Sequence, residues 1–210
     1  MSSTAGESQD LQQRLQQGEE QALGELFSRY RDRLWRTVRF RLDRRLSGRV
    51  DPDDILQESY LAAVQRLQHY ADDPSLTPFV WLRLIVSQTL VDVHRRHVGA
   101  QMRSADREVA PRGGFPQATS VSLANQFLGR LTSPSHAAMR AEMAGKLEAA
   151  IESMNPIDQE VLALRHFEEL SNSEVAEVLG IQQKAASIRY VRALARLKDI
   201  MAEMPGLMDE

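Results

Sequence analysis

Apolar residues in this 210-residue chain recur at intervals of three and four, which is the period of an amphipathic α-helix. The pattern is clear over residues 22–42, 56–67 and 139–154, and the first half of residues 79–97 is apolar around most of a helix. Stretches that alternate apolar and polar residues, as half-buried strands do, are absent from the sequence. The pattern therefore predicts an all-α fold.

Glycine and capping residues divide the first half of the chain. A short helix around residues 10–17 is expected to end at Gly18. A long helix is then expected to run to about Leu46, where Ser47-Gly48 breaks it.

The next helix has clear start signals. Asp51 is placed to cap it and Pro52 to occupy its first position. Residues 68–76 are expected to form a loop before another helix that begins at Pro78. The buried stripe of the helix after Asp51 is predicted to contain Leu56, Tyr60, Ala63, Val64 and Leu67.

Residues 99–132 lose the helical period and are rich in proline, glycine, serine and threonine, with only a weak helical signal at 122–131. This composition is typical of a flexible linker. We therefore predict two small helical domains joined by a flexible linker. The boundaries are a first domain at residues 8–99, a linker at 100–132, a second domain at 133–201 and an acidic tail at 202–210.

Two helices are expected at the start of the second domain. Asn155-Pro156 is predicted to begin the second of them, which ends near Phe167. The helix before it has a stripe of Met139, Met143, Leu147, Ala150, Ile151 and Met154.

Residues 170–197 have the pattern of two helices joined by a tight turn. Ser171 and Glu174 have the spacing of a capping box, and Gly180 stands where a helix that ends in a left-handed residue favours glycine. The second helix is basic and has no acid between residues 180 and 198. Lys184 in its first turn opposes the helix dipole at a cost of about 0.3–1 kcal/mol, and a phosphate group would reverse that sign. This favours a helix-turn-helix that binds DNA over two packed helices with an ordinary solvated face.

Composition limits the chemistry and the compartment. The chain has no cysteine, which excludes a disulfide framework, a thiolate zinc site and a cysteine nucleophile. The first ten residues are polar, and the longest apolar run, residues 79–91, is interrupted by Arg83, Ser87 and Gln88. We therefore expect a cytoplasmic protein without a membrane span.

The formal net charge of -3 hides an uneven distribution. Arginine is concentrated in residues 29–49, whereas acids are concentrated in 51–73 and 142–177. Patches of opposite sign indicate two partners, one anionic and one cationic.

The acids near the start of the helix after residue 50 are Asp51, Asp53, Asp54 and Glu58. With His94 and His97 they could form a metal or acid–base site. However, acids are favoured at a helix start in any case, and Arg95 and Arg96 would repel a cation beside the histidines. A docking face for an arginine-rich partner is the preferred interpretation.

Catalytic spacings are missing: there is no glycine-rich phosphate loop and no nucleophile elbow. The chain is therefore predicted to be a binding protein and not an enzyme, with no catalytic residue, cofactor or metal ion.

Aromatic and basic residues point to nucleic acid. Trp81 is predicted to be a core anchor, whereas Tyr70 has two open interpretations, a core position or stacking on an unpaired base. Arg83, Arg95 and Arg96 are predicted to neutralise phosphates.

Taken in order, residues 51–67, 81–97 and 147–197 resemble the motifs of bacterial sigma factors of the sigma-70 family, in the extracytoplasmic-function (ECF) group. The resemblance covers about residues 10–201. It implies a first domain that binds the coiled coil of the polymerase β′ subunit and reads the melted minus-10 element, and a last domain that reads the minus-35 element as duplex. The implied partners are core RNA polymerase, including its β subunit, and promoter DNA, and an anti-sigma factor is an open possibility.

The resemblance and the charge pattern together assign three sets of residues. The polymerase-binding set is Asp53, Asp54, Gln57 and Glu58. The minus-10 set, with the loop 69–76 as the one that captures a flipped base, is Tyr70, Arg83, Gln88, Arg95 and Arg96. The minus-35 set is Arg165, Gln182, Gln183, Lys184, Ser187, Ile188, Val191 and Arg192.

Two features depart from the family pattern. Gln88 stands where many relatives have asparagine. Ile188 and Val191 are apolar on the reading face, which favours thymine methyl groups or DNA shape over hydrogen-bonded readout.

The chain is therefore predicted to select promoters for core polymerase without making or breaking a bond. The second hypothesis is a stand-alone helix-turn-helix repressor or activator that binds duplex operators as a dimer. A metal-dependent hydrolase built on the acids and histidines comes third.

Overall fold

The computed structural model describes residues 3–43, 46, 48–98, 123–124 and 137–202, and every regular element in these ranges is a helix. This confirms the all-α prediction. The chain divides into two compact units, Met1–Pro116 and Gln117–Glu210. Within the described residues, no helix combines the length and the apolar character that crossing a membrane requires.

Most of the predicted linker and acidic tail lies outside the described residues. Leu123 and Ala124 are described, and both are helical and fully buried in the second unit. Residues of a freely solvated linker would be exposed. The weak helical signal at these two residues therefore corresponds to packed structure.

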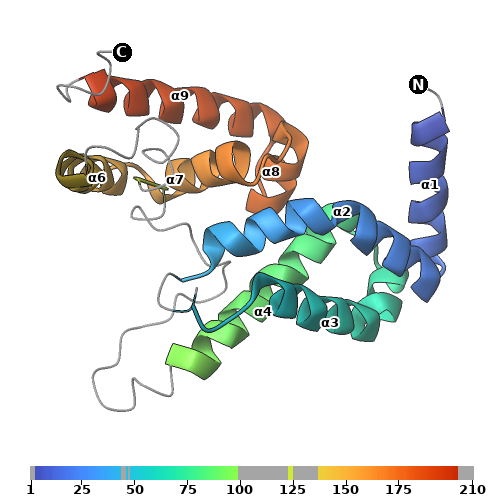
Figure 1. The fold of residues 1–210 in the computed structure, drawn as a ribbon. Coiled ribbons are helices and arrows are strands. Elements are labelled where there is room, and N and C mark those ends of the chain that lie inside the picture. The colour runs from blue at the N-terminus through green and yellow to red at the C-terminus, as the bar shows by residue number, and fades with distance from the viewer. Residues whose placement is uncertain (1–2, 44–45, 47, 99–122, 125–136, 203–210) are drawn as a thin grey trace. The chain divides into compact units, whose positions relative to one another are not determined.

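The described part of the first unit is a group of helices around α4. α1 (Ser3–Gln16) leads through Gly18, which has a left-handed φ of 76°, into α2 (Glu20–Arg41). α3 (Pro52–Asp72) and α4 (Pro78–Val98) pack against α2 and against each other, and α1 stands beside the N-terminal end of α2 (Figure 1). Residues 79–83 and 85–87 of α4 are all buried, as expected for the central helix of the unit.

A polar cluster joins α1 to α2. Arg14 donates a hydrogen bond to Glu19 at 2.8 Å and lies 3.4 Å from a carboxylate oxygen of Glu25. The hydrogen bond to Glu19 raises the pKa of the Arg14 guanidinium above its ordinary value. Leu11 and Leu15 of α1 are buried. Both apolar packing and these charged contacts therefore hold α1 against the rest of the first unit.

α2 ends at Arg41 and not at Leu46, so the predicted length was wrong. Leu42 makes the last helical hydrogen bond, to the carbonyl of Val38, and its own backbone is extended. Leu46 is buried nonetheless, because a turn in which its N–H donates to the Asp43 carbonyl carries it to the core. The four-residue spacing of two leucines does not distinguish a helix from such a turn.

α3 begins as predicted and ends later than predicted. Asp51 accepts a hydrogen bond from the Asp53 N–H at 2.9 Å, and Pro52 is the first helical residue. The helix continues to Asp72, so the predicted loop was wrong over residues 68–72. Tyr60 and Val64 are only partly buried, and the observed buried stripe is Ile55, Leu56, Ser59, Ala63, Leu67 and Tyr70.

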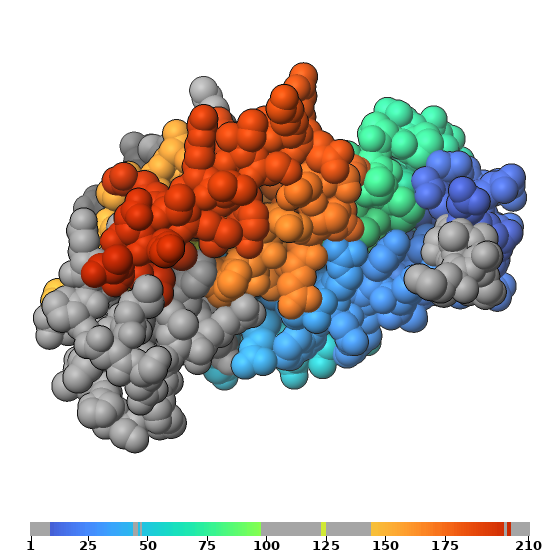
Figure 2. Space-filling view, turned by 90° about the horizontal axis from the view of Figure 1, so that it is seen from above, coloured from blue at the N-terminus to red at the C-terminus, as the bar shows by residue number. Residues whose placement is uncertain are grey.

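The second unit contains α6 (Ala137–Glu152), α7 (Pro156–Leu162), the π-helical turn η2 (Ala163–Phe167), α8 (Asn172–Leu179) and α9 (Gln183–Ala202). Asn155 caps α7 by accepting from the Ile157 N–H at 2.9 Å, as its position before proline predicts. α9 packs against α6, α7 and α8, and it forms an exposed ridge of this unit (red in Figure 2). The packed side of α9 contributes Ala193 to a buried cluster that also contains Met154 and Leu162.

The predicted stripe of α6 is partly confirmed. Leu147, Ile151 and Met154 are buried and Ala150 is partly buried, whereas the side chains of Met139 and Met143 lie outside the described set.

The chain reverses between α7 and α8 through η2. The N–H of Glu168 donates to the carbonyl of Ala163, and the N–H of Leu170 donates to that of Leu164. Glu169 has a left-handed φ of 57° in this reversal. The helical part of the chain ends at Phe167, as predicted, but no signal in the sequence indicated that its last turn is π-helical.

Local signals set both ends of α8. Ser171 accepts from the Glu174 N–H while the Glu174 carboxylate accepts from the Ser171 N–H, which completes the predicted capping box. Gly180 ends the helix with a left-handed φ of 62°. The turn into α9 is therefore specified by residues within the turn itself.

We predict that Gly180→Ala lowers the free energy of unfolding by about 1–2 kcal/mol, because a Cβ disfavours the left-handed conformation even where space is free. Denaturant unfolding followed by circular dichroism measures the change.

Gly145→Ala is the matched control. Gly145 is exposed inside α6, without a left-handed φ, and a Cβ there meets nothing within 4 Å. The same substitution should therefore raise stability, by about 0.5–1 kcal/mol. Equal effects of the two substitutions would show that backbone conformation at Gly180 is not the cause.

Candidate functional site

The predicted polymerase-binding residues lie together on the first two turns of α3. All four are exposed, and we name them the acidic face of α3: Asp53, Asp54, Gln57 and Glu58. Leu61 follows one turn later with an exposed fraction of 59%, so an apolar side chain borders the acids. Charged and apolar groups on one exposed helix surface are suited to contact a protein partner.

Two of these acids form ion pairs with neighbouring helices. Asp53 lies 2.6 Å from Arg31 of α2, and Glu58 lies 2.5 Å from Arg96 of α4. The four side chains are each about half exposed, and such pairs are worth about 0–1 kcal/mol. The pairs orient the carboxylates at little cost and are easily exchanged for those of a partner.

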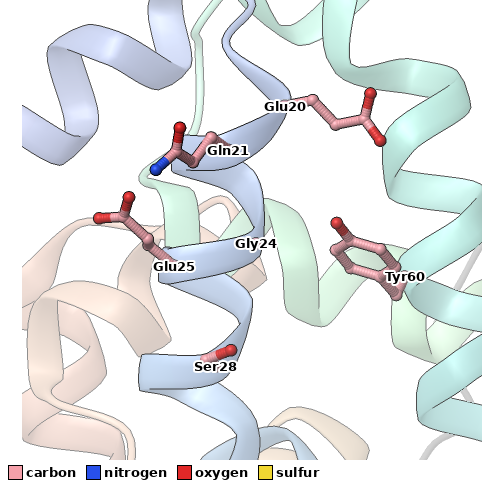
Figure 3. Close-up of a pocket in the computed structure, with 6 residues that line it drawn as sticks. All are labelled: Glu20, Gln21, Gly24, Glu25, Ser28 and Tyr60. Carbon is pink, nitrogen blue, oxygen red and sulfur yellow. The ribbon is translucent and has the colours of Figure 1, made fainter.

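An open groove of about 680 Å³ lies between α2 and α3. Tyr60 points its hydroxyl from α3 towards α2, whose lining residues include Glu20, Gly24 and Ser28 (Figure 3). The groove was not anticipated from the sequence, and its lining contains no cluster suited to a metal ion or a nucleophile.

The packing of α3 on α4 buries Tyr70. Its ring stacks on Trp81 with 4.3 Å between centroids, and its hydroxyl donates to the Leu76 carbonyl at 2.8 Å. Tyr70 has an exposed fraction of 3% and Trp81 of 8%, so both are core anchors in this structure. The interpretation of Tyr70 as an exposed stacking platform was wrong for this conformation.

The remaining predicted minus-10 residues separate into two groups. Arg83 is fully buried in α4 and does not present its charge to solvent. Gln88, Arg95 and Arg96 are exposed along the second half of the same helix. We name these three residues the α4 surface.

A neighbour of the α4 surface was missed in the sequence. Arg66 of α3 is exposed, and its Nη1 donates a hydrogen bond to Oε1 of Gln88. Arg66 is in none of the three residue sets assigned from the sequence, and only the side-by-side packing of α3 and α4 brings it to Gln88.

The structure also separates the residues of the metal hypothesis. His94 lies 3.3 Å from Asp43, and Glu58 pairs with Arg96. Among the described residues, no three histidine, aspartate or glutamate side chains gather closely enough to hold a metal ion.

In the second unit, one side of α9 is packed and the other is open. Ala186, Ala193 and Leu197 are buried, and Tyr190 and Leu194 are partly buried. Ile188 and Val191 have exposed fractions of 41% and 65%. The exposed residues of the minus-35 set on or beside α9 are Gln182, Gln183, Lys184, Ile188, Val191 and Arg192.

The other two residues of that set are held by the protein. Ser187 accepts a hydrogen bond from Asn172 of α8 at 2.7 Å, which links the two helices. Arg165 donates to the Leu170 carbonyl and stands 5.0 Å from the ring centroid of Tyr190. Arg165 therefore stabilises the turn before α8, and its contact with DNA stays a prediction.

Comparison with known proteins identifies a family. The sequence profile described as "ECF sigma factor" matches residues 6–203. The chain is 27% identical over 192 residues to the ECF RNA polymerase sigma factor BldN of Streptomyces coelicolor, covering 90% of this chain and 64% of that protein's length. It is 24% identical over 194 residues to the RNA polymerase sigma factor CarQ of Myxococcus xanthus, covering 91% and 96%.

A solved structure has a similar fold. It contains CnrH in complex with the cytosolic domain of CnrY and aligns with a TM-score of 0.51 at 21% identity, covering 94% of this chain and 99% of that chain. At this identity the likeness shows the fold alone.

We predict that Tyr70→Phe lowers the free energy of unfolding by about 1 kcal/mol, because it removes the hydrogen bond to the Leu76 carbonyl. Thermal or denaturant unfolding of the purified variant measures the change.

Tyr60→Phe is the control, since its hydroxyl faces the open groove (Figure 3). It should change stability by less than about 0.5 kcal/mol. A Tyr70→Phe variant as stable as the wild type would mean that the ring is not anchored as described.

Proposed function

The chain belongs to the family of ECF sigma factors, the proteins that direct RNA polymerase to promoters at transcription initiation, and we propose that it does so through three surfaces. The acidic face of α3 binds core polymerase. The α4 surface binds the minus-10 element. The exposed side of α9, as the second helix of a helix-turn-helix formed with α8, binds the minus-35 element.

The observation that carries this proposal is the separation of charge. The acidic face of α3 is exposed in the first unit, while α9 in the second unit has no acid in its first turn. A cationic protein partner suits the first surface and nucleic acid suits the second. The family resemblance supports the β′ coiled coil of core polymerase as the cationic partner.

Docking at the acidic face would exchange ion pairs. In the free protein, Asp53 pairs with Arg31 and Glu58 pairs with Arg96. On docking, cationic side chains of the polymerase take the place of these two arginines. Such an exchange favours specificity and association rate over raw affinity. Leu61 adds an apolar contact next to the charges.

The α4 surface is suited to contact both the phosphate backbone and the base edges of DNA. Arg95 and Arg96 lie in the last turn of α4 and supply positive charge for phosphates. Gln88, two turns earlier, supplies an amide for base edges. Tyr70 and Arg83 support this surface from the core, which is the role that their burial favours.

The α9 surface combines charge and apolar contact. Lys184 in the first turn faces a phosphate most favourably, because the anion also meets the positive end of the helix dipole. Ile188 and Val191 are then placed to contact thymine methyl groups in the major groove.

A stand-alone repressor or activator is the alternative. It would use α9 in the same way but would leave the acidic face of α3 without a partner. Tight binding of the isolated chain to duplex DNA, without polymerase, would favour this alternative. An anti-sigma factor as a further partner stays a prediction.

Reversal of one charge tests the docking surface. We predict that Asp54→Lys weakens binding to core polymerase at least about tenfold, because it places a like charge against the cationic partner. Fluorescence anisotropy of the labelled full chain, titrated with core enzyme in the absence of DNA, measures the affinity.

Asp73→Lys makes the same charge change at the other end of α3, where Asp73 is exposed at the C-cap. It should bind core polymerase as the wild type does. Equal losses for both variants would mean that total charge matters and not the acidic face.

Two substitutions on α9 separate charge from base reading. Lys184→Ala should weaken holoenzyme binding to all minus-35 sequences alike and lower the slope of log K against log salt by about 1. Ile188→Asn should leave that slope unchanged and alter the preferred base at one position. Binding of the holoenzyme to promoter fragments, each with one minus-35 base changed, measures both effects at several salt concentrations.

Lys198→Ala, an exposed lysine near the far end of α9, is the control and should change neither quantity. If Lys184→Ala altered base preference and Ile188→Asn did not, the assigned roles would be incorrect.

A further inference from the structure

The contact between Arg66 and Gln88 lies on the seam where α3 and α4 run side by side. Nη1 of Arg66 donates to Oε1 of Gln88, and both side chains are exposed. The Glu58–Arg96 ion pair lies towards one end of this seam and the Tyr70–Trp81 stack towards the other. The two helices are therefore antiparallel here, in a register that places Arg66 opposite Gln88.

This contact fixes the hydrogen-bonding capacity of the Gln88 amide. A glutamine amide has one oxygen that accepts and one NH₂ group that donates. The guanidinium of Arg66 donates to Oε1 of Gln88. A second donor that approached Oε1 would be close to the positive charge of Arg66, which disfavours its binding there. The NH₂ group stays available, and Arg66 has further N–H donors in its planar fork. The pair thus presents donors to its surroundings.

Base edges differ in what they offer to such a pair. Adenine presents an N7 acceptor beside the N6 donor, and a glutamine with both amide atoms available pairs with that edge through two hydrogen bonds. Guanine presents N7 and O6, which are both acceptors, and this edge matches a pair that only donates. Occupation of Oε1 by Arg66 therefore disfavours adenine and favours guanine.

We propose that Arg66 is a further promoter-reading residue, which positions the Gln88 amide so that the Arg66–Gln88 pair selects guanine over adenine at one nucleotide of the minus-10 element. This inference depends on the proposed role of the α4 surface in binding that element. It adds a residue of α3 to the proposed DNA-reading surface and states which base that surface prefers.

A selection experiment with the holoenzyme tests the proposal. Core polymerase carrying the full-length chain is incubated with promoter fragments that have randomised minus-10 positions, and the fragments in open complexes are sequenced. For the wild type, one position should show more guanine than adenine. For Arg66→Ala, the guanine-to-adenine ratio at that position should fall about fivefold or more, because the freed oxygen accepts from N6 of adenine.

Two further variants separate base reading from charge. Gln88→Ala should lower the guanine-to-adenine ratio at the same position, and adding Arg66→Ala to it should remove the preference that the freed guanidinium retains. Arg95→Ala removes another exposed arginine, from α4. It should lower the occupancy of all sequences alike, as loss of a phosphate contact does.

The possible failures are distinguishable. If Gln88→Ala alters one position while Arg66→Ala lowers all sequences equally or changes nothing, Arg66 does not position the amide and the inference is overturned. If neither Gln88→Ala nor Arg66→Ala alters any position, the assignment of the α4 surface to the minus-10 element is overturned as well.

Discussion

The stack of Tyr70 on Trp81 sets the geometry on which the first unit's surfaces depend. It fastens the end of α3 to the start of α4, and the Tyr70 hydroxyl also ties the intervening loop through the Leu76 carbonyl. Each residue of slip along a helix rotates a side chain by about 100° and shifts it by about 1.5 Å. A fixed register at this corner therefore decides that Arg66 meets Gln88 and that Glu58 meets Arg96 further along the seam. The proposed docking and minus-10 surfaces depend on one buried aromatic contact.

Capping signals in the sequence predicted the starts of α3, α7 and α8 and the end of α8, whereas the ends of α2 and α3 depended on tertiary packing. Asp51-Pro52, Asn155-Pro156 and the Ser171–Glu174 box each satisfy backbone N–H groups within a few residues, so their effect is visible in the sequence. The end of α3 was misplaced because Tyr70 extends the buried stripe by one more turn, which only the position of Trp81 reveals. The π-helical turn after α7 had no local signal either.

The site could be predicted where its chemistry depends on exposure along one helix. The exposed acids of α3 and the exposed Ile188 and Val191 of α9 follow from the same periodicity that identifies the cores. Sequence could not place Arg83, which sits on a helix that is buried around most of its circumference. It also could not reveal Arg66, because its importance comes from a residue on another helix.

The charge distribution is relevant to how two weak DNA contacts, one proposed for each unit, would combine into specific promoter binding. Each proposed DNA-binding surface offers few side chains for base edges, and a good base contact contributes only about 1–3 kcal/mol of discrimination. Two such surfaces held on one polymerase convert the second contact into an intramolecular step, which raises the effective affinity without any new contact. In the proposed complex the polymerase would supply part of the DNA affinity, so the chain would not need the positive net charge of a stand-alone DNA-binding protein. Its formal net charge of -3 is compatible with that proposed division of roles, because α9 and the end of α4 carry exposed cations while the exposed acids of α3 form the proposed polymerase-binding surface.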